Sequence, residues 1–138
     1  MTVKNPTLER HLQAHHLHVT KVRQLVYQVL QDHEPQTMQQ LVGHCQNRID
    51  RASVYRTVRL FEHLAIIQRL QIGWKYKLEL SNAFQDHHHH LTCLQCGRVT
   101  PLPEDHLLET QLTRLARYHD FDARDHQLEI RGLCSNCR

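Results

Sequence analysis

Apolar residues in the first 65 positions recur at the spacing of amphipathic helices. A first helix is expected from Asn5-Pro6, and a second between Thr20 and Asp32. Pro35 ends the second pattern, and a capping box that begins at Thr37 predicts a third helix. The apolar stripes of these helices are Leu8 and Leu12, then Val22, Leu25, Val26, Val29 and Leu30, then Leu41, Val42 and Cys45.

A fourth helix is expected from Asp50, a residue that favours the N-cap position. At about 100° per residue its side chains divide into two opposite arcs. The arc that must pack against neighbours contains Val54, Val58, Phe61 and Ala65. The opposite arc contains Ala52, Tyr55, Arg56, Arg59 and His63. This second arc is either a solvated helix face or a surface that binds a polyanion.

The period changes to two after residue 65. Residues 74–80 alternate strictly between apolar and polar side chains and follow a turn at Gly73, which predicts a hairpin with one buried face. Short helices followed by such a hairpin describe a winged helix-turn-helix. We therefore expect a winged-helix domain at residues 1–80 and a hinge at 81–86, where the periodicity is lost.

The second half of the chain mixes strands with one helix. Strands are expected at 87–94, at 98–102 and at 126–131, where side chains alternate. A helix is expected after Pro103, with an apolar stripe of Leu108, Leu112, Leu115 and Ala116. The fold class is therefore α+β, with a small α/β domain at 87–138 after the winged helix.

Charge separates the two halves as well. Residues 1–80 contain 11 Lys and Arg against 6 Asp and Glu, and residues 81–138 contain 6 against 8, so balances of +5 and −2 give the net +3. A basic half suits a polyanion partner. No apolar run approaches the roughly 20 residues of a membrane span and no signal peptide opens the chain, so we expect a cytoplasmic protein without a membrane partner.

Four of the five cysteines form two C-x2-C pairs, Cys93 with Cys96 and Cys134 with Cys137. In a reducing compartment such pairs indicate a metal site before disulfides, and four thiolates suit tetrahedral zinc. A closed four-Cys site leaves no position for chemistry, so its role would be structural. Two disulfides or free thiols are the alternative, and Cys45 alone is expected to be a small buried side chain.

A run of four histidines, residues 87–90, precedes the first C-x2-C pair. In an extended strand, successive side chains point to opposite faces, so His87 and His89 would face one way and His88 and His90 the other. One strand could therefore serve two metal sites. The alternative is an exposed loop that binds adventitious metal.

Three segments together carry a family resemblance: RASVYRTVR at 51–59, HHHHLTCLQCG at 87–97 and GLCSNC at 132–137. In this order and spacing they resemble the ferric uptake regulator family of bacterial metal-dependent transcription factors. The resemblance implies a homodimer that binds a palindromic DNA operator through its winged helices and takes no small-molecule substrate. It also implies an α/β dimerisation domain, and metal bound near the hinge that switches DNA affinity.

The resemblance further implies three metal sites. The structural zinc site would be Cys93, Cys96, Cys134 and Cys137; the regulatory site His33, Glu79, His88 and His90; and the dimerisation-domain site His87, His89, Glu109 and His126. Lys77 stands where relatives have one carboxylate ligand, and Glu79 is the nearest substitute for it. Pro101 stands where they have a second carboxylate, and Glu104 is a distant alternative. The second, regulatory divalent metal is expected to be Fe(II), with Zn(II) and Mn(II) as alternatives.

For DNA, Tyr55 and Arg56 match the recognition-helix residues of the family, and they lie on the arc that periodicity alone left exposed. The full expected DNA-binding set is Tyr55, Arg56, Arg51, Ser53, Arg59 and Arg23. His18 replaces a basic residue that relatives often have.

Other functions stay open at this point. A zinc uptake regulator or a manganese or peroxide-type regulator would share the same motifs. A metal buffer would bind metal without sequence-dependent DNA affinity. A small metallo-hydrolase could use His87, His89, His126 and Glu109 as an open site, although the chain has no H-E-x-x-H motif and is short for a substrate cleft.

Overall fold

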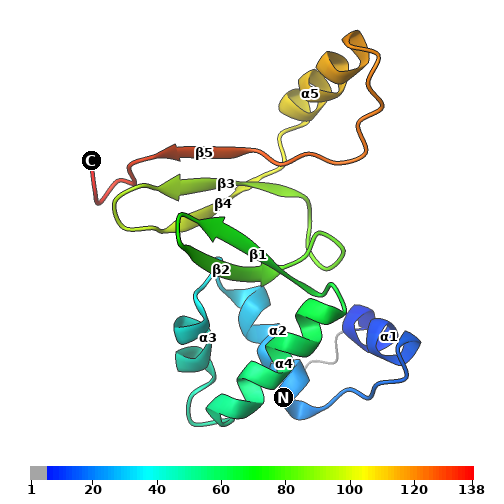
Figure 1. Ribbon diagram of the computed structural model, residues 1–138, viewed down its shortest axis with the longest axis vertical. Helices are drawn as coiled ribbons and strands as arrows, with labels where there is room; N and C mark the ends of the chain where they lie inside the picture. The colour runs from blue at the N-terminus through cyan, green and yellow to red at the C-terminus, as the bar shows by residue number, and fades with distance from the viewer. Residues whose placement is uncertain (1–5) are drawn as a thin grey trace. The chain divides into compact units, whose positions relative to one another are not determined.

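The computed structural model describes residues 6–138 (Figure 1). Contacts divide the chain into a first unit that ends at Gln85 and a second unit, Asp86–Arg138. The expected N-cap at Asn5 lies outside the described residues. Within the part of the chain that the structure describes, no helix combines the length and apolar character needed to cross a bilayer.

From residue 6 onward the first unit contains four helices, and the predicted start of the second near Thr20 and the N-caps predicted at Thr37 and Asp50 are confirmed. The Thr20 side chain accepts a hydrogen bond from the Arg23 backbone N–H, and Asp50 accepts one from Ser53. Thr37 forms the full capping box. The helices are α1 (Pro6–Ala14), α2 (Lys21–Asp32), α3 (Met38–Cys45) and α4 (Arg51–His63).

One hydrophobic core joins these helices to the hairpin that follows. Val54, Val58 and Phe61 of α4 are buried in it, as the periodicity predicts. The expectation that Ala65 continues this buried face is wrong. The helix ends at His63, and Ala65 is exposed with a φ of 55°. Leu64, at the C-cap, fills that part of the core instead.

The hairpin consists of β1 (Ile67–Ile72) and β2 (Lys75–Leu80), paired antiparallel. Its inner end is buried at Leu78 and Leu80. Trp74 departs from the predicted alternation, because it lies in the turn and its side chain is fully exposed. Gln36, just before α3, forms an isolated antiparallel bridge with Leu78 and so fixes the hairpin against the helices.

The second unit is a three-stranded sheet in the order β4-β3-β5 with one helix. Strand β3 pairs antiparallel with β4 and parallel with β5, and α5 lies in the crossover that the parallel pair requires. The predicted strand at 126–131 begins only at Glu129, and Leu115 in the predicted stripe of α5 is exposed. The elements are β3 (His88–Cys93), β4 (Val99–Pro103), α5 (His106–Tyr118) and β5 (Glu129–Gly132).

Candidate metal centres and nucleic-acid surface

The four cysteines of the C-x2-C pairs gather into one cluster in the second unit. Their four sulfur atoms all lie within 4.8 Å of one another, and the Cys96 and Cys134 sulfurs are 3.9 Å apart. A tetrahedral zinc ion with Zn–S bonds of about 2.3 Å would separate its sulfurs by about 3.8 Å, whereas a disulfide would bring two of them to about 2.05 Å. The sulfur atoms are therefore spaced for a shared metal ion rather than for a disulfide, and all four thiols are free.

Local backbone structure shapes this cluster. Gly97 follows the first pair with a φ of 73°, which closes the turn, and its N–H donates to the Cys93 carbonyl. Backbone N–H groups of Cys96 and Cys134 lower the pKa of the Cys93 thiol to about 6. Hydrogen bonding to Cys134 raises the pKa of the Cys137 thiol to about 12. The site therefore holds one thiolate readily, and a divalent cation would stabilise the others.

A second cluster joins His87, His89, Glu109 and His126, all in the second unit. The Nε2 atoms of His87 and His126 are 3.2 Å apart. Glu109 lies between the rings, with Oε1 2.6 Å from His89 Nε2 and Oε2 3.1 Å from His126 Nε2. Ligands of a tetrahedral ion with bonds of about 2.0–2.1 Å lie about 3.3 Å apart, so this cluster also fits a metal.

Electrostatics favours a cation in this second cluster. Burial opposes ionisation of Glu109, but hydrogen bonding from His89 and the nearby His126 and His87 outweigh burial and lower the pKa of this carboxyl. His89 is almost fully buried, and among the described residues its Nδ1 has no hydrogen-bond partner. The His89 ring therefore makes its polar contact inside the cluster, through Nε2 to Glu109. The α5 helix supplies Glu109 and the irregular segment before β5 supplies His126.

The other face of β3 carries His88 and His90, whose Nε2 atoms are 3.1 Å apart. His88 Nδ1 lies 2.9 Å from the Asp86 carbonyl, which can only accept, so Nδ1 carries the proton. The Nε2 lone pair of His88 is then directed toward His90. This arrangement fixes the tautomer that a metal ligand needs.

His33 and Glu79 belong to the first unit. His33 is exposed directly after α2, and its Nδ1 donates to the Val29 carbonyl at 2.8 Å, which leaves Nε2 as the acceptor. Glu79 is buried on β2 and accepts a 2.6 Å hydrogen bond from Gln68. Leu78, the residue before Glu79, forms the backbone bridge with Gln36, and this bridge fixes the segment after His33 beside β2.

Two residues of this region escaped the sequence reasoning. The His44 ring stacks on the His33 ring with centroids 4.0 Å apart, and His44 Nδ1 lies 2.7 Å from Gln36 Oε1. Burial, and then the nearby His33, lower the pKa of His44. No motif marked His44 or Gln36, since their partners come from other elements. The helical spacing of the α3 residues assigns His44 to one face of the helix, but it does not identify the residues that His44 contacts.

The outward arc of α4 is basic. Arg51, Arg56 and Arg59 are exposed, and Tyr55 is half-buried. Arg51 donates to the Tyr55 hydroxyl at 3.2 Å, and Arg56 donates to the Ser53 hydroxyl at 3.1 Å. These contacts orient the side chains along one helix face. Arg23, on α2, donates to the His18 carbonyl at 2.5 Å.

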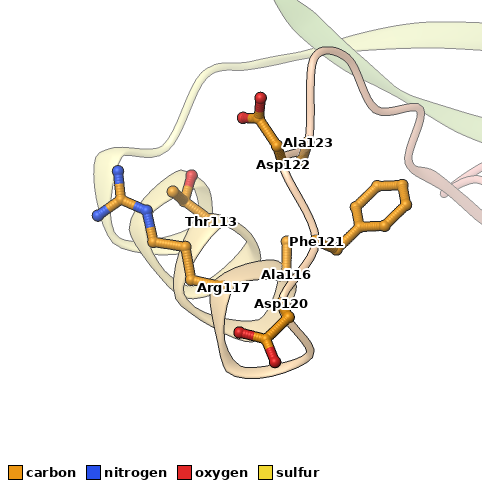
Figure 2. A pocket seen from close by; sticks show the side chains of 7 residues that line it. All are labelled: Thr113, Ala116, Arg117, Asp120, Phe121, Asp122 and Ala123. Carbon is orange, nitrogen blue, oxygen red and sulfur yellow. The ribbon is translucent and has the colours of Figure 1, made fainter.

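A separate pocket lies at the C-terminal end of α5 (Figure 2). Arg117 and Phe121 point away from each other there, and none of the clustered His or Cys side chains lines the pocket. This pocket is therefore distinct from the metal-ligand clusters. Its lining residues are Thr113, Ala116, Arg117, Asp120, Phe121, Asp122 and Ala123.

The sequence of this chain is similar to a family model and to several known proteins. The ferric uptake regulator family model matches residues 14–131. The ferric uptake regulation protein of Bacillus subtilis is 35% identical over 100 residues, which are 70% of this chain and 66% of that protein. In four such relatives, the match with this chain covers 54–66% of the relative's own length.

Two further similarities span nearly the whole chain. The peroxide-responsive repressor PerR of Staphylococcus aureus is 28% identical over 142 aligned positions, which cover 100% of this chain and 82% of that protein. The solved structure of a zinc-bound manganese uptake regulator is 30% identical, with a TM-score of 0.70, and the match covers 93% of this chain and 98% of that one.

The fold, the four-Cys cluster and the matches agree. A helical first unit with a hairpin, followed by an α/β unit with a four-Cys cluster, is the architecture implied by the resemblance. The matched proteins are regulators rather than enzymes, and this argues against the alternative of a small metallo-hydrolase. The chain therefore belongs to the ferric uptake regulator family of metal-dependent transcriptional regulators.

Proposed function

We propose that this protein is a cytoplasmic repressor that binds a palindromic operator as a homodimer when a divalent metal occupies its regulatory site. The observation that carries the proposal is the pair His88 and His90, whose Nε2 atoms lie 3.1 Å apart close to the predicted hinge at 81–86, with the His88 tautomer suited to a metal. The basic arc of α4 supplies the surface that would read DNA.

The regulatory site would take ligands from both units. We propose His33 and Glu79 from the first unit and His88 and His90 from the second. Ligands that share one ion restrain the angle between the units, and thereby the spacing of the two recognition helices in a dimer. Moving such an equilibrium from 1:99 to 99:1 requires about 5.5 kcal/mol of differential affinity, which is within reach of a multi-ligand transition-metal site.

We propose Fe(II) as the sensed metal, with Mn(II), Zn(II) or peroxide sensing as the alternatives. The relatives include regulators named for iron, manganese and peroxide at similar identity. Opposite His90 in the register of β3 and β4 stands Pro101, which offers no ligand atom in its side chain. Peroxide sensing needs a carboxylate beside an oxidisable His ligand, so Pro101 favours the other metals over that role.

The homodimer is proposed from the second unit. Helix α5 has no buried residue, and large apolar side chains of this unit are exposed in the single chain. Such a surface is typical of an interface. The exposed side chains are Leu91, Leu94, Leu107, Leu115, Tyr118, Phe121, Ile130 and Leu133.

The first prediction concerns removal of the exchangeable metal. We expect operator affinity to fall about 5- to 150-fold after mild chelation and to return on anaerobic addition of Fe(II), because the coupling of two ligands through a conformational equilibrium has this range. Fluorescence anisotropy with a duplex selected by the metal-loaded protein from a random-sequence pool would measure it. Elemental analysis must show that the four-Cys zinc is retained. Equal affinity before and after chelation would contradict the proposal.

The four-Cys cluster generates a second prediction. Cys134→Ser should release one zinc per chain and lower the melting temperature, since the second unit has a small core and gains stability from the metal. Cys45→Ser is the matched control, because Cys45 is buried in the first unit and should leave the zinc content unchanged. Full zinc content in the Cys134 variant would show that the cluster is not the zinc site.

A third prediction separates the regulatory ligands from other histidines. His88→Ala should weaken the metal-activated operator binding at least about tenfold, since even outer-shell changes cost 10- to 100-fold in metal affinity. His106→Ala, an exposed His at the start of α5, is the control and should bind like the native protein. The measurement is operator affinity as a function of free metal. Identical metal dependence in both variants would remove His88 from the site.

The arginines of α4 should divide by role. Arg56→Ala should reduce the free energy of operator binding by about 1–3 kcal/mol and relax the preference for particular bases. Arg59→Ala should weaken binding to all duplexes evenly, and the slope of log affinity against log salt concentration should fall by about 1 per subunit. Arg10→Ala on α1 is the charge-matched control. Binding isotherms at several salt concentrations would test this division. Unchanged isotherms for both α4 variants would contradict the assignment of this face.

A further inference from the structure

The segment that joins the two units is held on the first unit by hydrogen bonds. Ser81 donates from its backbone N–H to the Ile66 carbonyl at 2.8 Å and from its hydroxyl to the Ala65 carbonyl at 2.7 Å. The Phe84 N–H donates to the Ser81 carbonyl at 2.9 Å, which closes a turn over residues 82–84. The beginning of the predicted hinge is therefore fixed to the connection between α4 and β1.

The Phe84 side chain anchors the same segment. Its ring packs against the hydrophobic core of the first unit. It makes T-shaped contacts with His11 on α1, with centroids 5.0 Å apart, and with Tyr27 on α2, at 6.2 Å. Aromatic pairs at about 4.5–7 Å add stability beyond the area that they bury. The His11 ring is itself held in place, because its Nε2 donates to the Leu64 carbonyl at 2.8 Å.

The contacts of the two units begin and end at neighbouring residues. Gln85 ends the first unit, and its side chain donates to the Leu80 carbonyl. Asp86 begins the second unit, and its carbonyl accepts from His88 Nδ1 at 2.9 Å. A change in the angle between the units would therefore be absorbed by the backbone dihedrals of Gln85 and Asp86.

We propose that Phe84 is a positioning residue of the metal switch, because its ring holds residues 81–85 on the first unit and reduces the hinge to Gln85 and Asp86. This inference rests on the proposed function, since it requires that one ion takes ligands from both units. A short hinge keeps the ligands of one unit at a high effective concentration for an ion that the other unit holds. This concentration falls roughly as the −3/2 power of chain length, so a hinge lengthened from about two residues to about six lowers it about fivefold.

Backbone amide exchange tests the anchor without reference to DNA. In the native protein we expect the N–H groups of Ser81 and Phe84 to exchange more slowly than those of an unstructured peptide, with the regulatory metal present or chelated. Phe84→Ala should lose the protection at position 84 and keep that of the buried residues of α2. Exchange of the native Phe84 N–H at the rate of an unstructured peptide would overturn the inference.

Metal-activated operator binding tests what the anchor does. In Phe84→Ala, the free Fe(II) concentration that gives half-maximal binding to the selected duplex should rise about fivefold, whereas Phe84→Leu should stay within about twofold of the native protein. Val42→Ala is the matched control, because Val42 packs against the same core from α3, and it should leave this concentration unchanged. A lower melting temperature of Phe84→Ala with an unchanged Fe(II) requirement would show that the ring only stabilises the core, and would overturn the inference.

An insertion separates the length of the hinge from the packing of the ring. Four Gly and Ser residues inserted between Gln85 and Asp86 should also raise the Fe(II) requirement about fivefold. Phe84→Ala should then add only about twofold, because it lengthens a hinge of about six residues to about ten. If the insertion raises the requirement and Phe84→Ala does not, the inference is wrong and the proposed function stands. If the native protein shows no metal-activated binding to any duplex, the proposed function fails, and the inference with it.

Discussion

The period of a β-strand is the constraint on which the metal chemistry of this protein depends. Because successive side chains of β3 point to opposite faces, four consecutive histidines divide into two pairs. His87 and His89 face Glu109 and His126, whereas His88 and His90 face each other on the opposite side. A shift of one residue in the register of β3 would exchange the two sets and destroy both clusters. The same strand ends at Cys93, so its position is also fixed at the four-Cys cluster.

Metal ligands and apolar packing contribute differently in the two units. The first unit has a continuous core of buried Leu, Val, Ile and Phe side chains, and its N-caps and Gln36 bridge place His33 and Glu79 without any metal. The second unit has few buried apolar residues, none of them on α5. A cluster of four cysteines compensates for a small core, as in other small metal-binding domains. In the proposed function, the four-Cys cluster stabilises the second unit, and the separate pair His88 and His90 contributes to metal sensing.

Local signals predicted local structure well. The helix start near Thr20, the N-caps at Thr37 and Asp50 and the C-x2-C pairs are short-range patterns with a physical cause, and the structure bears them out. Errors arose where a pattern continued past the element that generated it. Ala65 matches the helical period but follows the end of α4, and Trp74 matches the strand period but lies in the turn. Contacts between distant elements, such as the bridge from Gln36 and the stacking of His44 on His33, leave no local pattern and could not be predicted.

In the proposed function, one ion takes ligands from both units. Anomalous diffraction at the iron, manganese and zinc edges, on crystals of anaerobically purified metal-loaded protein, tests it most directly. We expect a peak at the four cysteines, at the zinc edge, and a separate peak bound by His88 and His90 together with His33 or Glu79. A peak on His88 and His90 whose remaining ligands all come from the second unit or from water would contradict it.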